Sequence, residues 1–505
     1  MLKTVIVTPP TQDWTISPFP NLGPSILKTF LDSKGYKTDW IDLSVRVRYL
    51  NRFLLRKIFN LYLFVERDRV INFLENGKDI EIEEEIEKLI KLGDLAQYDV
   101  IGFSLHDDPN VIFSLCLAKI LKEKYSKKIV FGGPIIIRGD YEGLLDFDFI
   151  DFLIAGDGEK PFMKVLRYFE GKGSVENCDG IFYKKNGKKR TNKPSQLSLA
   201  NKPAPTFNID DLKLYRKLST RGLSILPYLL TRGCKFKCAF CTEYKNVSFN
   251  STPVKKVISD IKGLLKNYHP NLIYFAEANM FNDLNYIREL SKAIIRSRLH
   301  FLWGGFATIS DLQEETIKLM AKSGCKYLSL GTESASEPIL EKMRIRKVGN
   351  LETFKETLKL LHKYGIRVHI FFIVEFPHET DEDFKKSVDF VKETAKYTTT
   401  AAGSMFQLMK SSPVFLVPQA FKVRIRNRNM SRYNVLDRWL EFDEINGLKW
   451  RQKLKRGKRK EIILNKITHK RVGLGVTLRS SIKDPLYVIK KRISHPYTNY
   501  DEYLL

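Results

Sequence analysis

The sequence predicts an α/β protein: an N-terminal doubly wound parallel sheet, then a partial (β/α)6 barrel of the TIM type, then a small C-terminal region. Short apolar runs alternate with amphipathic stretches from the N-terminus to about residue 410, which is typical of βα units. Glycine and proline mark the ends of these runs, and 505 residues exceed what one ordinary core holds. We therefore expect domains at 1–200 and 211–410 and a basic C-terminal region at 411–505.

In the first region, helices are expected over Gly23–Gly35, where apolar residues share one face, and over Val111–Tyr125. A charged helical insertion over Arg46–Gly93 carries an acidic run that we expect to face solvent. The carboxyl ends of the strands, where such sheets bind ligands, carry the prolines and glycines. The polar segment Lys184–Asn208 predicts a hairpin turn that leads into a linker. The expected strands are Lys3–Pro10, Lys37–Leu43, Asp99–Leu105, Lys128–Pro134 and a run that begins at Phe149.

The second region repeats a strand followed by a helix six times, which predicts a barrel or partial barrel with its function at the C-terminal mouth of the strands. Two capping boxes, Ser310–Gln313 and Thr380–Asp383, indicate helix starts. The expected strands are Leu226–Thr231, Leu272–Ala276, Phe301–Phe306, Tyr327–Gly331, Val368–Val374 and Gly403–Leu408.

Composition indicates a cytoplasmic protein. The start, "MLKTVIVTPP", does not have the pattern of a signal peptide. The sequence has no uninterrupted apolar run long enough to predict a membrane-spanning helix. The six cysteines do not form a disulfide framework, in agreement with a reducing compartment. The formal net charge of +27 favours anionic partners such as nucleic acid, an anionic lipid surface or phosphorylated metabolites, although a lysine-rich composition alone explains it equally well.

The stretch "TRGCKFKCAFCTEY" places Cys234, Cys238 and Cys241 directly after the first strand of the second region. Thiolates bind zinc or iron–sulfur clusters, and structural zinc needs four closed ligands. A four-iron cluster takes one thiolate per iron, so three cysteines leave one iron open for a chelating ligand. Phe240 would supply apolar cover for the cluster. Zinc with a more distant fourth thiolate stays open as an alternative; the candidate donors are Cys116, Cys178 and Cys325.

This motif resembles that of the radical SAM superfamily, and the pieces "YDVIGFS", "IVFGGP" and "IAGDGEKPF" resemble the subfamily with an N-terminal cobalamin-binding, Rossmann-like domain. The resemblance implies a [4Fe-4S] cluster, S-adenosyl-L-methionine on its open iron, cobalamin, and an external electron donor of the flavodoxin or ferredoxin type. It also implies a methyltransferase that acts on an unactivated carbon of a small-molecule, lipid or peptide substrate.

The resemblance assigns roles residue by residue. Glu277 falls where the family contacts the methionine amino group, and Glu333 falls where a contact to the ribose or substrate is expected; we count both as catalytic candidates. The alternatives are a surface acid for Glu277 and a helix-capping acid for Glu333. The metal ligands are Cys234, Cys238 and Cys241, and the other cofactor-binding candidates are Phe240, Ser104, Gly132, Gly133, Gly156 and Gly158.

Some family features are missing. The D-x-H-x-x-G signature of histidine-ligated cobalamin proteins is absent, and we expect His106 to be a loop residue rather than an axial ligand. The glycine pair that often precedes the Glu277 position is Phe275–Ala276 here. Relatives usually carry arginine near Ala307 and glycine at Glu375, so the shape of the substrate side differs. The four glycines in the first region could also serve tight turns alone.

Other functions stay open. Within the same family, an oxidative cyclase or a rearrangement enzyme would share the cysteine motif. The charge and the run "KLKRGKRK", Lys453–Lys460, would suit a tRNA-modifying enzyme or a peripheral membrane contact, whereas a solvated helix face is the simpler interpretation. A corrinoid-binding scaffold without catalysis is the non-enzyme alternative.

Overall fold

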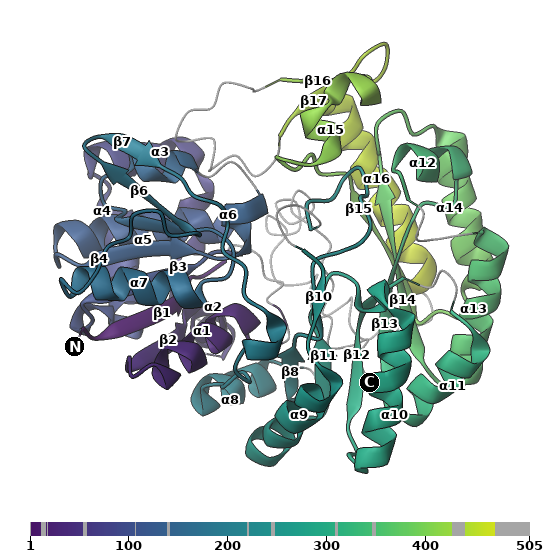
Figure 1. The fold of residues 1–505 in the computed structure, drawn as a ribbon. Helices are drawn as coiled ribbons and strands as arrows, with labels where there is room; N and C mark the ends of the chain where they lie inside the picture. The colour runs from purple at the N-terminus through teal and green to yellow at the C-terminus, as the bar shows by residue number, and fades with distance from the viewer. Residues whose placement is uncertain are drawn as a thin grey trace. The chain divides into compact units, whose positions relative to one another are not determined.

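The computed structural model describes residues 2–11, 17, 19–53, 58–106, 108–138, 142–219, 222–243, 248–308, 312–345, 350–426 and 440–469. The chain divides into two compact units, a first unit up to residue 224 and a second unit from residue 225. Each has its own parallel sheet (Figure 1), so the predicted α/β class is confirmed. None of the described helices combines the length and apolar character that crossing a bilayer would require.

The first unit is built on one sheet with the strand order β2-β1-β3-β4-β5-β6-β7. The first five strands in the chain are parallel, and β6 and β7 are antiparallel, joined by the hairpin turn that the sequence predicts. Because β1 lies between β2 and β3, the chain changes winding direction there, and such a switch point is where doubly wound sheets bind ligands. The strands are β1 Thr4–Thr8, β2 Thr38–Asp42, β3 Val100–Ser104, β4 Lys128–Gly132, β5 Phe152–Ile154, β6 Ile181–Lys185 and β7 Lys188–Arg190.

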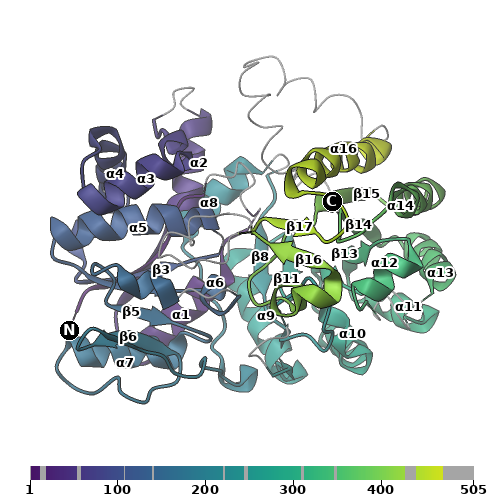
Figure 2. The same cartoon turned by 90° about the horizontal axis from the view of Figure 1, so that it is seen from above.

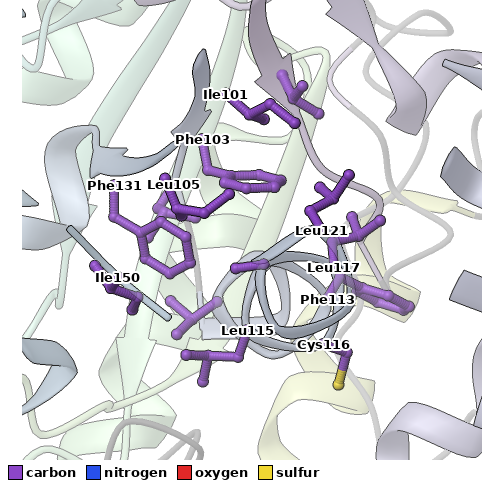
Figure 3. Packing of buried hydrophobic residues seen from close by; sticks show 14 of the residues in the cluster. Ile101, Phe103, Leu105, Phe113, Leu115, Cys116, Leu117, Leu121, Phe131 and Ile150 are labelled. Carbon is purple, nitrogen blue, oxygen red and sulfur yellow. The ribbon is translucent and has the colours of Figure 1, made fainter. Parts of the chain in front are cut away.

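Aromatic and aliphatic side chains fill the space between this sheet and its helices. The rings of Phe103 on β3 and Phe131 on β4 meet edge to face at 5.3 Å, and α5 packs Phe113 and Cys116 into the same cluster (Figure 3). The helices are α1 Leu22–Ser33, α2 Leu43–Phe53, α3 Arg67–Asn76, α4 Ile80–Leu92, α5 Asp108–Glu123, α6 Pro134–Arg138, α7 Glu159–Phe169 and α8 Ile209–Leu218.

The predicted helical insertion is confirmed as α2, α3 and α4. The acidic run on α4 mostly faces solvent, but Glu85 is only 7% exposed. Its carboxylate accepts a hydrogen bond from the backbone N–H of Asn60 and pairs with Lys88, so the prediction of a solvated face is wrong at this one position.

The second unit holds six parallel strands in the sequential order β8-β11-β12-β13-β14-β15, and all six predicted strands are confirmed. In the described residues β8 and β15 are the two edges of the sheet, and helices follow its strands in sequence (Figure 2). The strands are β8 Ile225–Tyr228, β11 Leu272–Phe275, β12 Leu302–Ala307, β13 Cys325–Glu333, β14 Arg367–Val374 and β15 Thr400–Met405. The helices are α9 Val254–Tyr268, α10 Leu284–Ser297, α11 Glu314–Lys322, α12 Glu337–Lys342, α13 Leu351–Lys363 and α14 Asp381–Thr394.

The two predicted helix starts differ in outcome. Thr380 and Asp383 form a complete capping box at the start of α14, as predicted. The Ser310–Gln313 box is wrong as a helix start, because α11 begins at Glu314 with Gln313 in the N-cap position; Ser310 lies outside the described residues.

The last helix of the described residues, α16 (Trp450–His469), covers the edge strand β15 (Figures 1 and 2). Side chains of α16 accept hydrogen bonds from the strand's backbone: Glu461 from Met405 N at 2.6 Å, and Asn465 from Gly403 N at 3.2 Å. An unpaired strand edge exposes such N–H groups to water or to another chain. The helix therefore occupies the place of a further strand.

The basic run Lys453–Lys460 lies on α16, and the prediction of a solvated face is wrong for two of its residues. Lys453 is fully buried and Lys460 is 3% exposed. Both ammonium groups reach buried carboxylates, Lys453 to Glu444 at 2.5 Å and Lys460 to Glu379 at 2.7 Å. These two lysines therefore form buried ion pairs inside the second unit.

Candidate functional site

The three cysteines lie on a loop between two short strands of the second unit. Strand β9, Thr231–Arg232, pairs antiparallel with β10, Asn250–Ser251, and this pairing closes the base of the loop. The loop follows β8 and therefore stands at the C-terminal edge of the parallel sheet, as predicted. Cys238 is 5% exposed, whereas Cys234 and Cys241 are half-buried.

The side chain of Asn282 fixes the backbone on both sides of Cys234. Its amide nitrogen donates to Gly233 O at 3.4 Å, and its oxygen accepts from Lys235 N at 3.1 Å. The same amide nitrogen also donates to Asn279 O at 2.7 Å, which ties Asn282 to the loop after β11. The position of Cys234 is thus set by the neighbouring strand's loop.

A second fastening holds the part of the loop that carries Cys238 and Cys241. Ala239, which is fully buried, donates its N–H to Met343 O at 2.8 Å and accepts from Val414 N at 3.1 Å. Met343 follows α12, and Val414 lies in the short helix α15, Pro413–Leu416. Two segments distant in sequence therefore grip the spacer between the last two cysteines.

The donor set fits an iron–sulfur cluster. Three thiolates on one loop can each take a separate iron, so they need not converge on a single point. Within the described ranges, no three Cys, His, Asp or Glu side chains converge as ligands of one metal ion. The Glu243 N–H points to Cys241 Sγ at 3.4 Å, and hydrogen bonds to ligand sulfurs tune cluster potentials. Phe240, the residue expected to cover the cluster, is half-buried next to Cys241.

The remaining cysteines differ from the loop cysteines. Burial raises the pKa of the Cys116 and Cys325 thiols, so both favour the protonated form. Cys325 is the first residue of β13, so it lies at the end of the sheet opposite to the cysteine loop. Cys178 points its thiol at the Asp179 carbonyl, 3.6 Å away.

Glu277 and Glu333 both lie at the C-terminal edge of the second sheet. Glu277 follows β11, is 4% exposed, and accepts a hydrogen bond from Leu230 N at 3.4 Å, so its carboxylate touches the segment that enters the cysteine loop. A surface location for Glu277 is wrong. Glu333 ends β13, is 8% exposed and has a φ of +66°. Ser336, not Glu333, holds the N-cap position of α12.

The first unit gathers its candidate residues at the carboxyl edge of its own sheet. Ser104 ends β3 and lies 3.4 Å from the His106 ring, and Gly132 ends β4. Gly133 and Gly156 have φ values of +108° and +90°, and a Cβ at either would press on backbone atoms of this unit, 2.3 Å from Leu105 O and 2.1 Å from Ser195 O respectively. Gly158 occupies the N-cap position of α7.

Sequence reasoning missed Asn110, Asn279 and Asn282. Asn110 is 4% exposed and donates to the carbonyls of Pro9 and Pro10 at 3.2 and 2.9 Å, so it joins the loop after β1 to α5. Its oxygen accepts from His106 N at 3.2 Å. This residue bridges the loops after β1 and β3, where the winding of the sheet switches. A buried amide gives no periodic signal, so only the fold reveals these three residues.

Comparison with known proteins agrees with this geometry. Residues 228–391 match the family model of the radical SAM superfamily. The chain is 25% identical over 314 residues to "Uncharacterized methyltransferase PH0819" of Pyrococcus horikoshii, covering 61% of this chain and 66% of that protein. It is 25% identical over 335 residues to the cytidylyl-2-hydroxyethylphosphonate methyltransferase of Streptomyces wedmorensis, covering 58% and 62%. The chain thus spans just under two thirds of the length of these curated relatives.

A solved structure extends the likeness to both units. The radical S-adenosylmethionine methyltransferase TsrM from Kitasatospora setae, solved with cobalamin and a [4Fe-4S] cluster bound, superposes with a TM-score of 0.63 at 14% identity. The superposition covers 91% of each chain. The predicted succession of two parallel-sheet units is confirmed at the level of the fold.

Proposed function

We propose that this chain, whose residues 228–391 belong to the radical SAM superfamily, is a cobalamin-dependent radical S-adenosylmethionine methyltransferase that acts on an unactivated carbon. The observation that carries the proposal is the three-cysteine loop, fastened by Asn282 and by Met343 at the C-terminal edge of a parallel sheet. The shared two-sheet fold supports the cobalamin part of the proposal.

The second unit would hold the cluster and S-adenosylmethionine. When bound, these groups supply one-electron radical chemistry, and cobalamin supplies the methyl group. Cys234, Cys238 and Cys241 would each bind one iron, which leaves the fourth iron for S-adenosylmethionine. Glu277 would accept a hydrogen bond from the ammonium group of S-adenosylmethionine, since its buried carboxylate contacts the segment that enters the cysteine loop. Glu333 would bind the ribose or the substrate.

The first unit would hold cobalamin at the carboxyl edge of its sheet. Asn110 keeps the loops after β1 and β3 in fixed positions, since both atoms of its amide group are hydrogen-bonded. Ser104 would lie at this edge beside the corrin. The glycines at 132, 133, 156 and 158 would line the approach because they carry no side chain.

Iron and sulfide analysis of anaerobically reconstituted protein tests the cluster. The wild type should bind about four irons and four sulfides per chain, as a cubane requires. Cys238→Ser should lose most of this content. Cys325→Ser is the matched control, because it also removes a buried thiol of the same unit and should retain the cluster. Equal iron content in the two variants would refute the assignment.

Methyl transfer is tested separately with S-adenosylmethionine that carries a deuterated methyl group. With a cobalamin-loaded enzyme, a flavodoxin- or ferredoxin-type reductant and candidate metabolite, lipid or peptide substrates, the product should carry the labelled methyl and 5′-deoxyadenosine should form. 5′-Deoxyadenosine without labelled product would instead indicate cyclisation or rearrangement, and it would overturn the methyltransferase proposal while leaving the radical step intact.

A further inference from the structure

A cavity of about 560 Å³ opens in the second unit, a size typical of sites for small molecules. It lies between α12, the loop after β14, the short helix η6 (Pro418–Phe421) and the turn after β17 (Phe442–Glu444). The apolar side chains of its lining include Phe421, which is 8% exposed, and Ile445, which is 37% exposed; Phe376 is fully buried, with its ring centroid 6.3 Å from that of Phe421. The cavity thus offers an apolar surface of the kind that packs against a ring or a short chain.

The rim of this cavity is basic. Lys342, Arg344 and Lys422 line it, against a single acid, Glu341. In the described part of the chain, none of the three cations has a carboxylate within ion-pair distance, although the Arg344 guanidinium lies 5.4 Å from the centre of the Phe421 ring. Cationic side chains around a concavity create a positive potential that attracts anions.

The backbone around the cavity is in a conformation that favours glycine, yet no glycine is present there. Arg344, His378, Lys422 and Asn446 all line the cavity, and their φ values are +56°, +60°, +49° and +55°. Left-handed residues with a Cβ are uncommon and gather at functional sites. Glycine at positions 344 and 422 would adopt these φ values with less strain. The backbone is therefore strained at two positions whose side chains are cations.

The rim is held rigidly. The Lys422 carbonyl accepts from Ile445 N at 2.7 Å and lies 3.1 Å from the His378 ring nitrogen. Arg344 directly follows Met343, whose carbonyl accepts the Ala239 N–H of the cysteine loop. The backbone of the cations is therefore fixed before a ligand arrives, which lowers the entropy lost on binding.

We propose that this cavity binds an organic phosphate. The phosphate dianion would sit among Lys342, Arg344 and Lys422, because arginine and lysine are the side chains that recognise phosphate. The organic group would pack on Ile445 and the exposed edge of Phe421. Binding at this cavity can be tested on protein without a cluster.

Phenyl phosphate is a suitable probe, since it combines a dianion with one aromatic ring. Calorimetric titration should show saturable binding that weakens as potassium chloride is added. Inorganic phosphate, benzoate and benzyl alcohol should each bind at least tenfold more weakly than phenyl phosphate. Benzoate binding as tight as phenyl phosphate, or no saturable binding of phenyl phosphate, would overturn the proposal.

Glycine variants separate binding from folding. Arg344→Gly and Lys422→Gly remove a cation at positions where glycine fits the backbone, so each should unfold at a temperature no lower than wild type and bind phenyl phosphate at least tenfold more weakly. Arg298→Gly is the matched control, because Arg298 is an exposed left-handed residue at the end of α10, outside the cavity. Unchanged affinity in the first two variants, or equal loss in the control, would refute the site.

Discussion

Replacing Glu375 should destabilise the second unit strongly. Glu375 follows β14, is fully buried, and has a φ of +60°. Three cations of α16 surround its carboxylate: Lys460 at 2.6 Å, Arg456 at 3.0 Å and Lys453 at 3.5 Å. Neither carboxylate oxygen meets hydrogen-bond geometry with a described atom, so charge attraction is the main stabilising contact.

The magnitude follows from the charges that remain. Without Glu375, Lys453 still pairs with Glu444 and Lys460 still pairs with Glu379. The three buried or half-buried cations, however, lose the one carboxylate that they share. Removing one partner from a buried ion pair costs about 3–5 kcal/mol. Glu375→Ala should therefore lower the free energy of unfolding by about 3–5 kcal/mol. Glu375→Gly should cost about 1 kcal/mol less, because glycine accepts the left-handed backbone.

Urea unfolding of the apoprotein, followed by tryptophan fluorescence, measures both changes. Trp450 opens α16 and is 6% exposed, so it reports on the helix that carries the three cations. Glu352→Ala is the control, since it removes an exposed partner of Lys355 and should change stability by about 1 kcal/mol or less. The double variant E375A/R456M should recover part of the loss, because the other ion-pair partner of Arg456, Asp381, is exposed to solvent. If Glu375→Ala costs no more than Glu352→Ala, the reasoning is wrong.

Three further predictions follow from the contacts of single residues. Asn282→Asp keeps the acceptor oxygen but loses the donating amide, so the reconstituted cluster should lose iron to a chelator several-fold faster than in wild type, with unchanged thermal unfolding of the apoprotein. Burial raises the pKa of Asp42 from 3.8 to about 7, so its protonated form favours folding. This contribution to the free energy of unfolding is complete below about pH 4 and is lost as the pH rises to 7. Relative to Asp42→Asn, the free energy of unfolding of the wild type, measured by urea titration, should fall by about 4 kcal/mol over this window. If the two proteins lose stability in parallel as the pH rises, the raised pKa of Asp42 is wrong. Gly133→Ala should destabilise by at least about 2 kcal/mol more than Gly35→Ala, because both have positive φ but only Gly133 has backbone 2.3 Å from the new methyl group; equal melting temperatures would exclude the clash.

The order of strands could be predicted because it depends on local patterns. Each strand of the second sheet is an apolar run bounded by turn residues, and sequential parallel pairing then needs no further information. The boundaries moved where the backbone found another partner: the first predicted strand, Leu226–Thr231, divides into β8 and β9 because Thr231 and Arg232 pair with β10. The three cysteines could also be predicted from the sequence, since their spacing alone indicates the cluster chemistry.

The residues that hold the cysteine loop in place could not be predicted from the sequence, for a physical reason. Asn282 contacts Gly233 and Lys235, nearly fifty positions earlier in the chain, and Met343 contacts Ala239 through backbone atoms that any residue possesses. The Asn282 bonds require a side-chain amide, but a single asparagine distant in sequence forms no periodic pattern, and the Met343 bond requires no particular residue type. Only the folded arrangement of neighbouring loops brings such partners together.

The basic run shows how charge can mislead when it is taken without its partners. Lys453, Arg456 and Lys460 are spaced i, i+3 and i+7, so they share one face of α16, and that face meets the buried Glu375. The buried Glu375 and the basic run that suggested nucleic acid or membrane are therefore two halves of one cluster. The exposed residues of the run, Lys455 and Arg459, lie on another face of the helix. Any anionic macromolecule that docks on α16 must use this narrower set, so the run supports such a partner far less than its total charge suggests.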